Sequence, residues 1–72
     1  MDTITETIRA VNEALAETTE PDMEFLRHSV ECLARANDAR AELCVDDIVS
    51  ILEERGFLQE ADALAAAYVA AA

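Results

Sequence analysis

The chain has 72 residues, enough for one small domain, and its sixteen acidic residues against five basic ones give a net charge of −11. Direct binding to nucleic acid or to an anionic membrane is disfavoured at this charge, because the phosphate contacts that dominate such binding need Lys and Arg. One Gly and one Pro in the whole chain leave little material for tight β-turns. We therefore expect a single all-α domain over residues 1–72, folded as a compact bundle of about four short helices.

Two amphipathic helices are expected in the first half of the chain. Apolar residues at spacings of three and four predict the first helix, from about residue 4 to 18, with a stripe of Ile4, Ile8, Val11 and Leu15. Thr3 and Glu6 have the spacing of a capping box at its start. Pro21 separates this helix from the next, for which Thr19 is the expected cap. The second stripe reaches about residue 36 and consists of Met23, Leu26, Val30 and Leu33.

The sequence after the second helix leaves one boundary open. Asn37 and Asp38 are a plausible stop, since Asn tolerates the left-handed conformation. Residues 39–43 either form a short helical turn or continue the second helix, and the pattern does not decide between these alternatives.

A third helix is predicted from Val45 to Arg55. Cys44 stands where an N-cap residue belongs, and Leu43 and Ile48 have the spacing of a hydrophobic staple across the helix start. Gly56 follows as the expected left-handed terminator. The helix is therefore expected to be bounded on both sides by its own local sequence.

A fourth helix is expected from about Leu58 onward, in an alanine-rich segment of strong intrinsic helicity. Together with the third helix it superficially resembles a helix-turn-helix. A DNA-reading version needs basic residues on the second helix, whereas this segment offers Glu60 and Asp62 and no base. We therefore expect no direct binding of nucleic acid.

Metal binding and catalysis have little support in the sequence. His28, Cys32, Cys44 and Asp46 are candidate metal ligands, but the chain has no C-x-x-C pair of the kind that zinc sites usually show. The expected alternative places Cys32 in the core, Cys44 at a helix cap and His28 on the surface. The sequence has no glycine-rich loop, and no spacing singles out a pair of carboxylates for acid–base catalysis. We expect a non-enzyme without metal or cofactor.

No basic-then-apolar segment of the signal-peptide type is found near the start, and no apolar run is long enough to span a bilayer. These observations predict a cytoplasmic protein without a membrane partner. Both cysteines are then expected to be reduced.

Acidic side chains gather in two stretches of the sequence. The first runs from residue 13 to 24, with no basic residue between Arg9 and Arg27, and the second lies on the expected outward face of the third helix. Carboxylates fixed on a small rigid body can imitate phosphates toward a basic groove. The candidate partner-binding residues are Glu13, Glu17, Glu20, Asp22, Glu24, Asp46, Asp47, Glu53 and Glu54. The alternative interpretation is a solvated face that serves solubility alone.

In size, charge and helical content the chain is similar to small acidic phage-encoded inhibitors, including many anti-CRISPR proteins and DNA mimics. That class has no common motif, so the resemblance implies no residue roles. It implies a protein that occupies a basic surface on a protein partner, most concretely as an inhibitor of a nucleic-acid-handling complex. The alternatives are a structural module that homodimerises through its apolar helix stripes and an antitoxin-like protein that neutralises a basic toxin.

Overall fold

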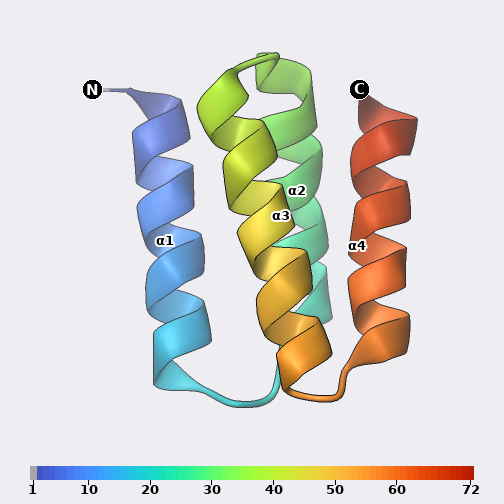
Figure 1. Ribbon diagram of the computed structural model, residues 1–72. Helices are drawn as coiled ribbons and strands as arrows, with labels where there is room; N and C mark the ends of the chain where they lie inside the picture. Colours follow the sequence, from blue (N-terminus) through green and yellow to red (C-terminus); the bar gives the residue numbers. More distant parts are fainter. Residues whose placement is uncertain (1) are drawn as a thin grey trace.

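The computed structural model describes residues 2–72, which form four helices joined by short connections (Figure 1). The helices are α1 (Thr3–Glu17), α2 (Met23–Ala36), α3 (Ala39–Glu54) and α4 (Leu58–Ala71). Each runs antiparallel to the one before it. The α1–α2 connection and the α3–α4 turn, residues 18–22 and 55–57, therefore share one end of the bundle, here named the lower end. The prediction of an all-α bundle of about four short helices is confirmed.

The four helices are arranged around a central α2–α3 pair. α1 packs against one side of this pair and α4 against the other, and α1 and α4 have no Cα atoms within 8 Å of each other (Figure 1). Most of the close Cα approaches between helices involve α4, since its alanine side chains let the backbones come near. α1 and α4 each pack on the central pair with one side, and their outer faces stay open to solvent.

The core contains the apolar stripes predicted from the sequence. In α1 and α2 the residues Val11, Leu15, Leu26, Val30 and Leu33 are buried, while Ile4, Ile8 and Met23 pack at its margin. α3 and α4 add Ile48, Leu52, Ala61 and Leu64. Val49 and Ile51 of α3 are only partly buried. The apolar stripes of α1 and α2 are therefore packed into the core of a single chain.

The expected caps of the first two helices are wrong, and aspartates take both positions. Asp2 precedes α1 and accepts a hydrogen bond from the backbone N–H of Ile4 (3.0 Å), while Thr3 is already helical. Asp22 precedes α2 and accepts from the N–H of Phe25 (3.2 Å). A carboxylate satisfies an unpaired N–H and also favours the positive end of the helix dipole, an advantage that threonine lacks.

The predicted start of the third helix is also wrong. α3 begins at Ala39, because Asp38 caps it by accepting a hydrogen bond from the N–H of Arg40 (2.8 Å). Asn37 adopts the left-handed conformation (φ 51°) that ends α2, so two residues suffice for the turn. Residues 39–43, left open by the sequence pattern, form the first turn of α3 and do not continue α2.

This earlier start changes the surroundings of two predicted cap residues. Cys44 lies inside α3 and is buried in the core, so it caps nothing. Leu43 is 65% exposed and forms no hydrophobic staple.

Gly56 ends α3 as predicted. Its φ of +89° is left-handed, a conformation that glycine adopts without a Cβ penalty. The N–H of Gly56 donates to the carbonyl of Glu53 (3.1 Å), and the N–H of Phe57 donates to that of Leu52 (2.8 Å). These two bonds are the Schellman motif. The turn brings Phe57 back against the core and starts α4 in the antiparallel direction.

Candidate functional site

Acidic residues from distant parts of the sequence come together at the lower end of the bundle. α1 and α3 both end there and α2 begins there, so their terminal residues are neighbours in space although more than thirty positions separate Glu17 from Glu53 (Figure 1). We name this group the acidic end. It consists of the predicted residues Glu13, Glu17, Glu20, Asp22, Glu24, Glu53 and Glu54.

Two of the predicted binding residues lie outside the acidic end, and two acidic residues that were not predicted lie beside it. Asp46 and Asp47 are exposed but lie in the middle of α3, away from the lower end. Glu60 and Asp62 lie in the first two turns of α4, at the lower end beside the acidic end, and were not among the predicted binding residues. The short turn at Gly56 was the signal that could have found them, because it returns the chain to the place where α3 stops.

The carboxylates of the acidic end are exposed and carry no ion pair within residues 2–72. The ion pairs of the described chain join Arg27 to Glu31 and Arg40 to Asp2 and Asp38. Arg55 is at the lower end, but its guanidinium donates to the backbone carbonyls of Leu15 (2.9 Å) and Thr18 (3.1 Å). The negative charge at this end is therefore largely uncompensated by the chain's own side chains.

Three of these carboxylates occupy positions that do not favour the fold. Glu17 is the last residue of α1, and Glu53 and Glu54 are the last two of α3. The carbonyl end of a helix is the negative end of its dipole, where acidic side chains are unfavourable by about 0.3–1 kcal/mol each. Neither helix has a basic residue in its last turn, and the cation beside both ends is Arg55, which is the C-cap residue of α3 and binds carbonyls at the end of α1.

The opposite end of the bundle pairs two of its carboxylates, Asp2 and Asp38, while Glu6 and Glu42 there are exposed without an ion pair among the described residues. The guanidinium of Arg40 contacts Asp2 (2.8 Å) and Asp38 (2.9 Å), and so joins the start of α1 to the start of α3. Hydrogen bonds from Arg40, with its positive charge, hold the pKa of both aspartates below the ordinary value of 3.8. The acidic end, with seven exposed carboxylates that have no ion pair within residues 2–72, therefore holds more unpaired negative charge than the opposite end.

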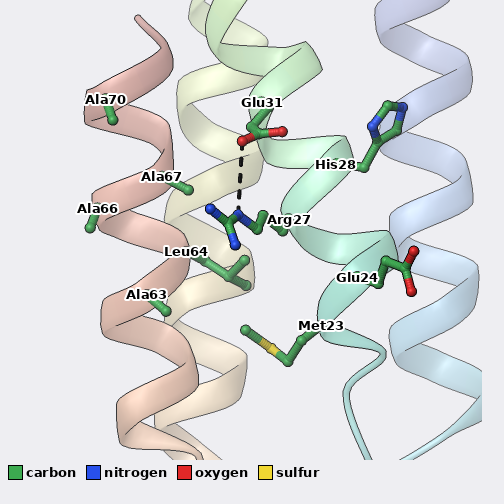
Figure 2. Close-up of a pocket in the computed structure, with 10 residues that line it drawn as sticks. All are labelled: Met23, Glu24, Arg27, His28, Glu31, Ala63, Leu64, Ala66, Ala67 and Ala70. Atoms are coloured by element: carbon green, nitrogen blue, oxygen red, sulfur yellow. Dashed lines mark ion pairs between the residues drawn. The ribbon is translucent and has the colours of Figure 1, made fainter.

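A groove of about 720 Å³ lies between α2 and α4 and opens to solvent, with an apolar α4 side and an α2 side that is largely polar. Figure 2 shows Met23 and Arg27 reaching from α2 toward α4, with Leu64 behind them and the small side chains of α4 opposite. On the outer side of α2, Glu24 and His28 point away from α4. The α4 side of the groove is lined by Ala63, Leu64, Ala66, Ala67 and Ala70.

The residues weighed as metal ligands do not converge. Cys32 Sγ lies 3.9 Å from His28 Nε2, one turn apart on α2, whereas Cys44 is buried in α3. Burial raises the pKa of the Cys44 thiol, and the charge of Asp47 adds to this effect. Within residues 2–72, no three His, Cys, Asp or Glu side chains gather as a metal site would require. None of the described helices has the length and apolar character needed to cross a membrane.

Comparison with protein families, curated proteins and solved structures finds no match for this chain.

Proposed function

We propose that this chain is a small, non-catalytic binding protein that places its acidic end on a basic surface of a protein partner. The observation that carries the proposal is the concentration of exposed, unpaired carboxylates at the lower end, together with the pairing of Asp2 and Asp38 at the other end. An acidic surface complementary to a basic patch speeds association and selects the partner.

The placement of Glu17, Glu53 and Glu54 supports binding over solubility as the role of these charges. Solubility needs net charge and is indifferent to where on the surface it lies. Carboxylates at the carbonyl ends of two helices lower stability, and such a cost is typical of residues that serve a function.

The most concrete form of the proposal is an inhibitor of a nucleic-acid-handling complex, of the anti-CRISPR or DNA-mimic type. A protein groove that binds nucleic acid is lined by Lys and Arg, and each phosphate contact in it is an ion pair. Carboxylates from α1, α2 and α3 would occupy the same cations and exclude the nucleic acid. Antitoxin-like neutralisation of a basic toxin would use the same surface.

The experiment compares two double variants with the same change in charge. Glu53→Lys with Glu54→Lys reverses two of the seven charges of the acidic end, and Glu6→Lys with Glu42→Lys reverses two exposed first-turn residues at the opposite end. Each tagged protein is incubated with nuclease-treated bacterial lysate, washed in rising salt and read by mass spectrometry. We expect the wild type and the Glu6/Glu42 variant to retain the same basic protein, released at moderate salt, and the Glu53/Glu54 variant to lose it.

Equal loss of the captured protein by both variants would show attraction to net charge alone and would contradict the proposal. A duplex of DNA or RNA added in excess should displace the chain from the captured protein if it inhibits nucleic-acid binding. Unfolding in urea provides the fold control, because the Glu53/Glu54 variant should be more stable than wild type by about 0.6–2 kcal/mol, the sum for two carboxylates removed from a helix carbonyl end.

Self-assembly through apolar stripes is the second proposal, and the observations favour it less. The stripes of α1 and α2 pack in the core of one chain, so a dimer would have to use another face. A homodimer of this kind predicts a melting temperature that rises with protein concentration. A melting temperature that is constant across a hundredfold dilution would contradict it.

A further inference from the structure

We propose that the groove between α2 and α4 binds one amphipathic helix of the basic partner, with the apolar face of that helix against α4 and its Lys and Arg side chains against the adjoining carboxylates. This inference rests on the proposed function, because the acidic end selects the partner and the groove receives one segment of it.

The size of the groove fits a short length of helix. Its α4 wall extends from Ala63 to Ala70 and its α2 wall from Met23 to Glu31, each about 10–12 Å at 1.5 Å per residue. This is about two helical turns, the length over which an amphipathic helix presents anchors at positions i, i+3 or i+4 and i+7. A groove of about 720 Å³ also exceeds what one side chain would fill.

The chemistry of the α4 wall favours an apolar helix face, whereas the α2 wall is largely polar and would meet the polar edge of that helix; its polar residues are Glu24, Arg27, His28 and Glu31. The α4 wall has no polar side chain, and Leu64 forms a fully buried floor. Alanines let a partner backbone approach closely, so larger apolar side chains of the partner can reach the floor. Arg27 extends into the groove, but it is 71% exposed and its contact with Glu31 is 3.8 Å long, so little energy holds it there.

Charge around the groove decides between a basic partner and a second copy of this chain. Glu24 belongs to the acidic end and also lines the α2 edge of the groove, although its carboxylate points away from α4, so the two surfaces adjoin at this residue. Glu60 lies one turn before Leu64, and Asp62 one turn before Ala66, which places two more carboxylates at the lower mouth. A second copy would bring another net charge of −11 to this position, whereas Lys or Arg on a partner helix would meet opposite charge.

The experiment selects binding peptides from a displayed library of helical sequences of about 18 residues, a length at which isolated helices begin to form. Selected peptides are then titrated against wild type and three α4 variants. Ala66→Trp and Ala70→Trp fill the groove, and Val69→Trp places the same side chain at an exposed residue that does not line it. We expect enriched peptides to have one apolar stripe with Lys and Arg opposite. We expect the groove variants to lose at least about tenfold in affinity and the Val69 variant less than about twofold.

Three outcomes would overturn the inference. The first is that no peptide is enriched, or that enriched peptides bind all three variants as tightly as wild type. The second is enrichment of apolar peptides that lack basic residues. The third is sedimentation of the wild type as a dimer that Ala66→Trp dissociates, because the occupant would then be a second copy.

The proposed function can survive failure of the groove. Peptides or captured proteins that respond to the Glu53/Glu54 reversal, but bind Ala66→Trp normally, would support the acidic end and reject the groove. Peptides whose binding is weakened by Ala66→Trp, but is unchanged by the Glu53/Glu54 reversal and by salt, would support the groove and reject the acidic end.

Discussion

Arg55 joins two distant parts of the sequence that meet at the lower end of the bundle, because its Nη2 donates a hydrogen bond to the carbonyl of Leu15 in the last turn of α1 (2.9 Å). Its Nη1 donates to the carbonyl of Thr18, the residue that follows this helix (3.1 Å). The last carbonyls of a helix have no intrahelical partner, and α1 has no basic residue of its own in the last turn to bind them. A residue from the α3–α4 turn therefore completes α1.

We predict that Arg55→Gln lowers the free energy of unfolding by about 1–2 kcal/mol, since hydrogen bonds that involve a charged group contribute about this much. Arg55→Lys keeps the charge and loses the planar fork that reaches both carbonyls, so its loss should be intermediate. Urea unfolding followed by circular dichroism measures both. Two variants as stable as the wild type would show that the contact with Leu15 contributes nothing.

Gly56 allows a test that depends only on backbone conformation. A Cβ added at this residue would meet no atom within 4 Å, so the cost of a side chain comes from its φ of +89° alone. We expect Gly56→Ala to destabilise the fold by about 1 kcal/mol. D-alanine, introduced by chemical synthesis, favours positive φ and should stabilise it by about 0.4–1 kcal/mol through a less flexible unfolded chain. Effects of the same sign would contradict the role of the Schellman turn.

The Arg40 network predicts a specific dependence of stability on pH. Arg40 holds the pKa of Asp2 and Asp38 below 3.8 in the folded chain, so the folded state binds fewer protons than the unfolded state near that pH. The stabilisation is complete above the unfolded pKa and is lost as the pH falls through the folded pKa. We therefore expect Arg40→Gln to be less stable than the wild type at about pH 7, with the difference shrinking below about pH 4.

The matched control for this series is Arg9→Gln, which removes the same charge from an exposed residue of α1 without an ion pair among the described residues. Its stability difference from the wild type should change less with pH. Parallel pH profiles for the two variants would show that Asp2 and Asp38 are not the groups responsible.

The reactivity of the α3 cysteine tests whether Cys44 is buried inside α3 or lies at the start of the helix as a cap. Cys44 is 6% exposed and its thiol has a raised pKa, whereas Cys32 is only partly buried. The thiolate is the reactive form, so Cys32→Ser should react with a disulfide reagent at least about tenfold more slowly than Cys44→Ser in native buffer. In urea the two rates should become similar. Equal rates in native buffer would instead place Cys44 on the surface, as a helix cap would be.

The local pattern of the sequence was sufficient for most of the fold. Apolar spacing predicted which faces of α1 and α2 are buried, and Gly56 and Asn37 marked two helix ends through their left-handed conformations. The caps were harder to predict. Thr3 and Thr19 fitted a cap pattern, yet Asp2 and Asp22 cap the helices, because a carboxylate combines hydrogen bonding with the attraction of the helix dipole. For the same reason Asp38 caps α3 in place of Cys44, and the helix therefore begins earlier than predicted.

The sequence by itself determined the helical class, the buried faces and the excess of negative charge. Only the tertiary structure decided which charges stand together, since that depends on the direction in which each helix runs. Antiparallel packing brought Glu53 and Glu54 to Glu17 and left Asp46 and Asp47 in the middle of α3. It also directed Arg55 to the carbonyls of α1 and opened the groove between α2 and α4. Helix faces follow from local spacing, whereas neighbours across the bundle follow from how the core is filled.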